Sequence, residues 1–286
     1  NPSSAGFANQ DGNTAQELYN DDIFVGYRYY DTFGKDVSYA FGYGGSYTTF
    51  AMSTKSVKAD KDKVTVQVKV KNTGSVSGKE VAEVYFSAPD GDLDKPYQEL
   101  VGYAKTDELA PGESQILTIS FDTSEMGSYD TAKAAYVMED GDYIIRVGNS
   151  SRNTHVAGKI SVAEDTITEQ YSNLMVPVTE NPNIKNDEKY PTLNPMTTDG
   201  ATPITYAGEE AEIAAASTID VDFSDYKAPV IKKENEDVTV YTSDTTEEKY
   251  LIAENKDGAT GTVSRVEKAN ANNTDYSVTY QEHVKK

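Results

Sequence analysis

A strict alternation of apolar and polar residues between Lys63 and Asn72 constrains the fold of this chain more than any other feature. The stretch reads KVTVQVKVKN, and every second position is a valine: Val64, Val66, Val68 and Val70. Successive side chains of a β-strand point to opposite faces, so these four valines share one face. The turn-forming residues Asn72-Thr73-Gly74 follow at once. The pattern predicts a strand with one face in a hydrophobic core.

Similar segments recur as far as residue 163, with turn signals between them. They read KEVAEVYFSAPDGD, YQELVGYAKT, SQILTISFD, YDTAKAAYVMEDGDYIIRVGNSS and HVAGKISV, and the fourth holds two strands hinged at Asp140-Gly141. Short strands at this spacing, without helical periodicity, are typical of an immunoglobulin-like β-sandwich. Tyr143 begins a late strand, where a tyrosine corner would lie. We expect the sandwich core to include Val66, Val84, Leu117, Ile119 and Ile145.

Residues 164–286 have a different composition. The segment TITEQYSNLMVPV is predicted to leave the sandwich as an extended arm or a short helix. Linker composition follows, with proline at positions 177, 182, 191, 195 and 203. GEEAEIAAAS is compatible with one short helix, and DVTVYTS, KYLIAEN, GTVSRVEK and DYSVTYQEHV with strands of a small second β region. The prediction for 164–286 is therefore a partly irregular linker with a possible small β region.

The segment from Asp22 to Phe50 is dense in Tyr, Phe and Gly. Two interpretations fit this composition. The rings either pack between domains, with their hydroxyl groups bonded to partners, or form a platform on which a sugar stacks. Glycines at Gly26, Gly42 and Gly44 would allow positive φ and close passage of the backbone.

Charge and composition exclude several classes of function. The net charge of −21 argues against nucleic acid and against anionic membrane surfaces as partners, because both attract Lys and Arg clusters. No apolar run approaches the length of a membrane span. The absence of Cys removes disulfides and thiolate metal sites and leaves the compartment undecided between bacterial cytoplasm and secretion. With only two histidines, we expect no metal site and no cofactor.

Residues 17–163 resemble the C-terminal part of glycoside hydrolase family 3, the β-glucosidase and β-xylosidase family. The matching motifs are YNDDIFVGYRYYD, AFGYGGSYTTF, VKNTGSVSGKEVAEVYFSAP, KPYQELVGYAKTDELAPGES and EDGDYIIRVGNSS. Some positions depart from the family pattern: Ala40 stands where Pro is usual, Gly45 where Leu is usual, and Asp21-Asp22 where Glu-Gly is usual. The loss of the Leu side chain at Gly45 predicts a looser contact there.

The resemblance implies three parts. Residues 1–51 would be the incomplete tail of an α/β-sandwich domain, 52–163 a fibronectin-III-like β-sandwich, and 164–286 the linker and possible small β region described above. In the family, the aromatic segment runs between the two domains. The resemblance therefore assigns inter-domain packing to Tyr27, Arg28, Tyr29, Phe41, Tyr43 and Tyr47, with Tyr39 beside them.

The catalytic groups that the family uses have no counterpart in this sequence. A retaining glycosidase needs two carboxylates about 5 Å apart. The resemblance implies a nucleophilic Asp on a (β/α)₈ barrel and an acid/base Glu on the α/β sandwich, and we assign no catalytic residue. Asp225 in FSDYK is a weak alternative nucleophile, and Asp31 and Asp36 are interpreted as turn or surface carboxylates. PDGDLD is interpreted as a solvated hairpin turn rather than a Ca²⁺ loop.

The sequence thus predicts a non-catalytic accessory portion of a family 3 β-glycosidase. Its partners would be the missing catalytic domains, which hydrolyse terminal β-linked glucose or xylose, and carbohydrate reached through them. Whether the chain is itself an enzyme stays open, although we expect it not to be competent alone. The alternative is a free-standing carbohydrate-binding or cell-surface adhesion module. Exposed coplanar Tyr rings would favour the alternative.

Overall fold

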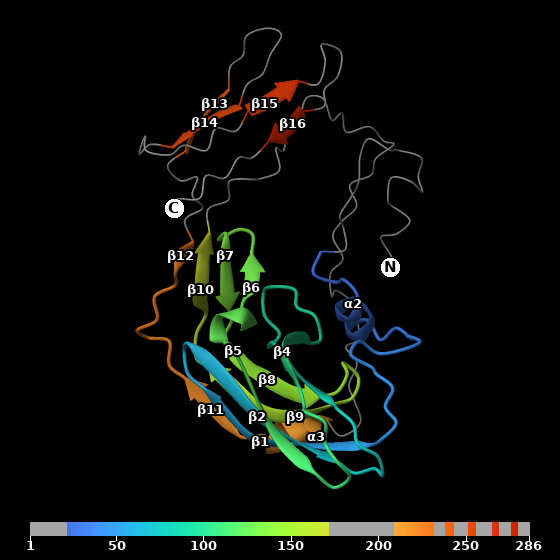
Figure 1. Cartoon of the computed structure of the whole chain (residues 1–286). Helices are drawn as coiled ribbons and strands as arrows, with labels where there is room; N and C mark the ends of the chain where they lie inside the picture. Colours follow the sequence, from blue (N-terminus) through green and yellow to red (C-terminus); the bar gives the residue numbers. More distant parts are fainter. Residues whose placement is uncertain are drawn as a thin grey trace. The chain divides into compact units, whose positions relative to one another are not determined.

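The computed structural model describes residues 22–171 and 209–231, together with the backbone of four short strands further along the chain. The chain divides into two compact units. The first comprises Asn1–Glu169 and Pro177–Ala228, and the second comprises Gln170–Val176 and Pro229–Lys286. The labels of helices and strands are those of Figure 1.

One sheet of the first unit has three antiparallel strands in the order β1-β2-β5. They are β1 (Phe50–Ala59), β2 (Lys63–Asn72) and β5 (Ser114–Asp122). All four valines of β2 are fully buried, which confirms the predicted face. Val66 lies opposite Ile119, and Val68 lies opposite Leu117. The period-two pattern of both strands therefore places their apolar side chains in one layer.

A second sheet has five strands in the order β11-β9-β8-β3-β4. They are β3 (Val81–Ser87), β4 (Glu99–Lys105), β8 (Gly141–Gly148), β9 (Thr154–Val162) and β11 (Thr218–Val221). The pairings are antiparallel except that of β11 with β9, which is parallel. Figure 1 shows β11, in orange, beside β9.

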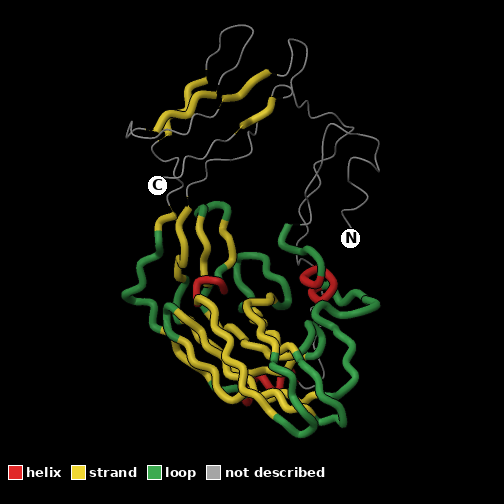
Figure 2. Tube along the Cα trace, in the orientation of Figure 1, coloured by secondary structure: helices red, strands yellow, loops and turns green. Residues whose placement is uncertain are grey.

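The inner faces of the two sheets share one hydrophobic core, which contains all five residues predicted for it. Tyr143 lies in this core with no exposed surface, and its hydroxyl donates to the carbonyl of Glu139 at 3.1 Å. This contact is that of a tyrosine corner. Figure 2 shows that strands make up most of the regular structure of the described residues. The predicted mainly β, sandwich-type fold is confirmed.

Shorter elements complete the described part of the chain. They are α2 (Tyr27–Thr32), the 3₁₀ turn η2 (Thr123–Met126), β6 (Ser128–Asp130), β7 (Ala135–Met138), β10 (Thr166–Tyr171) and α3 (Glu209–Ala215). Strands β10, β7 and β6 are neighbours in a small sheet. The α3 segment is the predicted short helix, and the first part of the predicted arm, Thr166–Tyr171, is a strand. Among the described residues, no helix has the length and apolar character needed to cross a membrane.

Of the strands that the sequence did not predict, β1 and β11 are the two that join the main sheets. β1 begins at Phe50, so the predicted boundary between residues 51 and 52 falls inside a strand. β11 lies in the region that the sequence assigns to a linker, yet Val221 is buried and belongs to the main core. Both were missed because neither has the sustained alternation of β2, and β11 pairs with a strand far from it in the sequence.

The second unit contains two antiparallel strand pairs. β13 (Val238–Thr242) pairs with β14 (Leu251–Asn255), and β15 (Arg265–Lys268) pairs with β16 (Tyr276–Thr279). These are the four strands that the sequence suggested. A short parallel pairing joins Gln170 and Tyr171 to β12 (Val230–Ile231). The five prolines of the predicted linker lie outside the described residues, and the described chain resumes at Glu209.

Candidate functional site

The candidate site is the aromatic segment of residues 22–50, whose first half is fixed to the sandwich. The hydroxyl of Tyr27 accepts a hydrogen bond from the backbone N–H of Leu100 at 2.9 Å. The Tyr27 ring stacks on Phe41 with centroids 4.6 Å apart and meets Tyr85 edge-on at 6.1 Å. Burial raises the pKa of the Tyr27 hydroxyl. Helix α2 is therefore held on β3 and β4 by both an aromatic and a polar contact.

Two ion pairs add to this attachment. Arg28 contacts Glu99 at 3.0 Å, and both side chains are about one-third exposed, so this pair contributes little free energy. Asp31 is only 2% exposed and accepts from Nε of Arg152 at 2.7 Å. The same guanidinium donates to the carbonyls of Tyr30 and Lys35. The interpretation of Asp31 as a turn or surface carboxylate was wrong, because α2 turns it inward onto Arg152. Asp36 is exposed, as expected.

The second half of the segment points its rings to solvent. Tyr39, Tyr43 and Tyr47 are 73%, 61% and 101% exposed, and Phe41 is 46% exposed. Tyr39 and Tyr43 stack on each other, with centroids 5.2 Å apart and an interplanar angle of 27°. We call Tyr39, Phe41, Tyr43 and Tyr47 the aromatic surface. The predicted set therefore divides: Tyr27 and Arg28 contact the sandwich, half-buried Tyr29 packs on Tyr30 and Phe33, and the rest form the aromatic surface.

Glycine is required at one point beneath the aromatic surface. Gly42 has φ of 82°, and a Cβ built there would lie 2.3 Å from the carboxylate of Glu83. Gly26 also has positive φ, at 59°. Gly44 differs from the expectation, since its φ is not positive and a Cβ there would meet nothing within 4 Å. Space is likewise open at Gly45, where the family usually has Leu.

Where the aromatic segment covers the outer face of the five-stranded sheet, that face carries buried polar side chains. Glu83 is 7% exposed, and the hydroxyl of Tyr85, which is fully buried, donates to it at 2.6 Å. Burial raises the pKa of Glu83, and the nearby Glu80 carboxylate raises it further, while the Tyr85 hydrogen bond opposes the shift. The pKa of Tyr85 is raised by burial and by the Glu83 carboxylate that it contacts. A buried carboxyl thus lies directly under the Gly42 turn.

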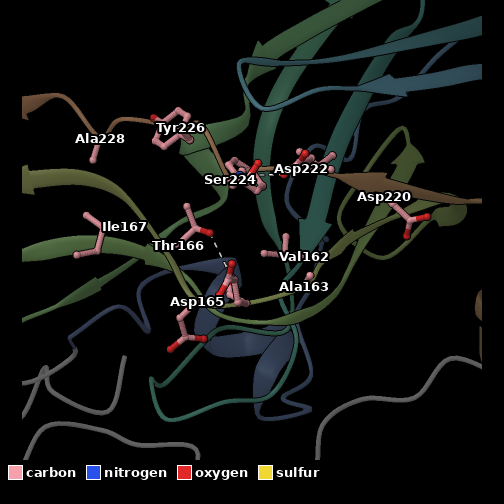
Figure 3. A pocket seen from close by; sticks show the side chains of 13 residues that line it. Val162, Ala163, Asp165, Thr166, Ile167, Asp220, Asp222, Ser224, Tyr226 and Ala228 are labelled. Atoms are coloured by element: carbon pink, nitrogen blue, oxygen red, sulfur yellow. Dashed lines mark hydrogen bonds between the residues drawn. The ribbon is translucent and has the colours of Figure 1, made fainter.

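A cleft of about 660 Å³ lies between the β9–β10 connection and the chain after β11 (Figure 3). Its lining includes Asp165, Asp220 and Asp222. Asp222 accepts the backbone N–H of Ser224 at 2.9 Å, and this bond lowers the pKa of its carboxyl. A glycosidase acid needs a raised pKa instead. Asp222 therefore does not fit the role of such an acid.

Other candidates from the sequence lie elsewhere. Asp225 has a 75% exposed side chain and contacts the ammonium group of Lys61 at 2.6 Å. In the part of the chain that the structure describes, no three His, Asp or Glu side chains are grouped to hold a metal ion. The PDGDLD turn is bonded to the sandwich by the buried carboxylate of Glu139. This carboxylate accepts a hydrogen bond from the backbone N–H of Asp92 at 2.7 Å and forms an ion pair with Lys95.

Comparison with known proteins defines the class of this domain. The family model described as a fibronectin type III-like domain matches residues 80–151. This range runs from the start of β3 to the turn after β8 and so covers the centre of the five-stranded sheet. The predicted fibronectin-III-like domain is confirmed.

Relatives extend the match beyond this domain. The chain is 42% identical over 184 residues to a β-glucosidase of Ruminococcus albus and 40% identical over 199 residues to β-glucosidase A of Butyrivibrio fibrisolvens. Each match covers 62% of this chain, but only 19% and 24% of the relative. The chain therefore spans about a fifth of the length of the curated relatives it matches.

Solved structures agree with these relatives. A β-glucosidase from Paenibacillus barengoltzii is 45% identical, with a TM-score of 0.56 over 60% of this chain and 20% of its own. β-Glucosidase 3B from Thermotoga neapolitana, in complex with α-D-glucose, is 43% identical, with a TM-score of 0.54 over 58% of this chain and 23% of its own. The resemblance to the β-glucosidases of glycoside hydrolase family 3 is confirmed for about 60% of the chain.

Proposed function

We propose that this chain is a non-catalytic accessory portion of a family 3 β-glycosidase, in which the sandwich braces the catalytic domains. In the whole protein, those domains would hydrolyse terminal β-linked glucose or xylose through a covalent intermediate. Support comes from the β-glucosidases that the chain matches, because it spans only 19% and 24% of two of them. A segment of that size leaves most of such an enzyme to other residues.

The observation that carries the proposal is the division of the aromatic segment. Tyr27, Arg28 and Asp31 fix one side of it to the sandwich by hydrogen bonds and ion pairs. The aromatic surface on the other side exposes large rings within a few residues of each other. Clustered exposed aromatic residues mark an interaction site, and Tyr suits such a site because the ring packs while the hydroxyl finds a partner. The missing catalytic domains would cover this surface.

A specific observation also favours the second candidate, a carbohydrate-binding module. The exposed rings of Tyr39 and Tyr43 stack on each other at an interplanar angle of 27°, and flat exposed aromatic rings are suited to stacking against sugars. The two functions differ in what covers the surface. In the first it is protein, and in the second it is an oligosaccharide.

A chimera separates the two candidates. Residues 22–171 would replace the matching segment of the Paenibacillus barengoltzii β-glucosidase, which is 45% identical. We expect the chimera to hydrolyse an aryl β-glucoside. Combined Tyr39→Ser, Tyr43→Ser and Tyr47→Ser should lower the temperature at which the chimera loses activity, while the melting temperature of the isolated chain stays unchanged.

The matched control is Ile116→Ser, because Ile116 is 55% exposed but lies on β5 in the other sheet. It should leave the chimera as stable as the parent chimera. If the triple variant behaves like this control, and soluble cello-oligosaccharides bind the isolated chain only when the three tyrosines are present, the bracing proposal is wrong. The carbohydrate-binding function would then take its place.

A further inference from the structure

A buried arginine on the outer face of the five-stranded sheet is neutralised by a residue from far along the chain. Arg146 on β8 is 4% exposed, and its Nε donates to the hydroxyl of Ser87 at 2.8 Å. The guanidinium lies over the ring of Tyr97, 4.9 Å from the centroid. Its carboxylate partner is Glu209, with which it forms an ion pair. Since a buried guanidinium without a counter-ion is costly, the sandwich depends on this carboxylate.

Glu209 is held by more than its charge. It is 7% exposed, and the hydroxyl of Tyr97 donates to both of its carboxylate oxygens, at 2.7 and 2.8 Å. Arg146 and Tyr97 together thus bind one carboxylate through an ion pair and a hydroxyl group. Together these two residues form a carboxylate-binding site. The carboxylate that occupies it is that of Glu209, the first residue of the short helix α3.

The chain after α3 then adds itself to the edge of the same sheet. β11 pairs in parallel with β9 from Thr218 opposite Lys159 to Val221 opposite Val162. The backbone N–H of Lys159 donates to the carbonyl of Ser217 at 2.9 Å. Val221 is 6% exposed and lies in the main core. The pairing is therefore anchored by backbone bonds and by an apolar side chain.

Two further polar contacts fix the ends of this segment. The carboxylate of Glu212 accepts from the backbone N–H of Val156 at 3.1 Å, and Asp225 contacts Lys61 on the loop between β1 and β2. We call residues 209–228 the strap. Its contacts combine a buried charge, a strand and an apolar anchor, which is how extended peptide ligands bind a sheet edge.

We propose that the edge of β9 and the Arg146–Tyr97 pair form a peptide-binding site, whose ligand is the strap of this chain. The chemical class of the ligand is a short acidic segment, with a carboxylate for Arg146 followed by a β-strand for β9. An uncovered edge strand exposes unpaired backbone groups to other chains, and the strap closes this one. The site uses no residue of the aromatic surface.

The test asks whether the strap stays bound without its covalent connections. Protease sites are inserted into the full-length chain between Tyr171 and Glu209 and directly after Ala228, and the purified protein is cut at both. We expect the freed strap to co-elute in gel filtration with the N-terminal fragment, which carries β9, Arg146 and Tyr97. With Glu209→Gln it should be released at least tenfold faster, because the ion pair with Arg146 is lost. Glu210→Gln is the matched control, since Glu210 is exposed on the same helix, and it should release at the parent rate.

Hydrogen exchange in the uncut chain gives a second readout. Glu209→Gln should speed exchange at the amide of Lys159, which is bonded to Ser217, while the amide of Leu100 on β4 should keep its rate. A strap that separates at once from the cut parent protein would overturn the proposal. Identical behaviour of Glu209→Gln and Glu210→Gln in both assays would overturn it as well.

Discussion

Replacing Ile119 and Gly102 tests the packing between the two sheets. Ile119 on β5 is 4% exposed, and a Cβ built at Gly102 on β4 would lie 2.7 Å from its Cγ2 atom. The bare backbone of Gly102 therefore leaves the space that Ile119 fills. Changing either residue alone should lower the free energy of unfolding. The double variant should lose less than the sum of the two single losses.

The magnitudes follow from the atoms removed or added. Ile119→Ala deletes three buried carbon groups at about 0.8 kcal/mol each, or about 2.4 kcal/mol, and the cavity term brings the expected loss to about 3–4 kcal/mol. Gly102→Ala forces a methyl group against Cγ2 of Ile119 and should cost about 1–3 kcal/mol. Since Ile119→Ala removes that Cγ2, the double variant should lose at least about 1 kcal/mol less than the sum of the two.

Urea denaturation followed by far-ultraviolet circular dichroism measures the four free energies of unfolding. A loss near zero for Ile119→Ala would mean that its side chain does not lie in the core. Strictly additive losses would refute the contact with Gly102, even if each single variant is destabilised.

Three further predictions concern activity, a single hydrogen bond and pH. The isolated chain should hydrolyse no aryl β-glucoside above background, and turnover that persists through repurification but disappears with Asp225→Asn would contradict this. Tyr143→Phe should lower the free energy of unfolding by about 1–2 kcal/mol, because the buried carbonyl of Glu139 loses its donor, and an unchanged denaturation midpoint would argue against the tyrosine corner. The raised pKa of Glu83 means that the folded chain holds this proton more tightly than the unfolded chain, so this group's contribution to stability falls as pH rises from the unfolded pKa through the raised one. Glu83→Gln should therefore stabilise the chain at pH 8 and lose this advantage toward pH 4, and an equal effect at both pH values would contradict the assignment.

The sandwich could be predicted from the sequence because its signals are local. Along β2 the apolar face is visible in the residues themselves, and the turn signals divide the strands that follow. Tyr143 was recognisable for the same reason, since its hydrogen-bond acceptor is only four residues away. Local period and turn chemistry suffice wherever one face of a strand is buried and the other is exposed.

Long-range polar contacts left no such signal. Glu209 stands in GEEAEIAA like any residue of an acidic surface helix, and nothing near it shows that Arg146 needs a counter-ion. Asp31 was misjudged in the same way, because its partner Arg152 lies in a distant turn. The strand β11 is short and pairs with β9, so its position depends on the finished sheet edge. These contacts exist only once the tertiary structure has formed.

The aromatic segment lies between these cases. Its composition predicts packing, and Tyr27 does pack on the sandwich through the ring of Tyr85 and the backbone N–H of Leu100. Which rings face the sandwich and which face outward depends on the direction of α2 and on the turn at Gly42. The assignment of the exposed rings to an inter-domain interface stays a prediction.

The most direct test of the central proposal is hydrogen exchange at residues 38–47, measured in the isolated chain and in the chimera with the Paenibacillus barengoltzii enzyme. If the aromatic surface docks on catalytic domains, these amides should exchange rapidly in the isolated chain and at least about tenfold more slowly in the chimera. The amide of Leu100, which is bonded to Tyr27, should be protected equally in both and serves as the internal reference. Equal exchange at residues 38–47 in an active chimera and in the isolated chain would contradict the proposal.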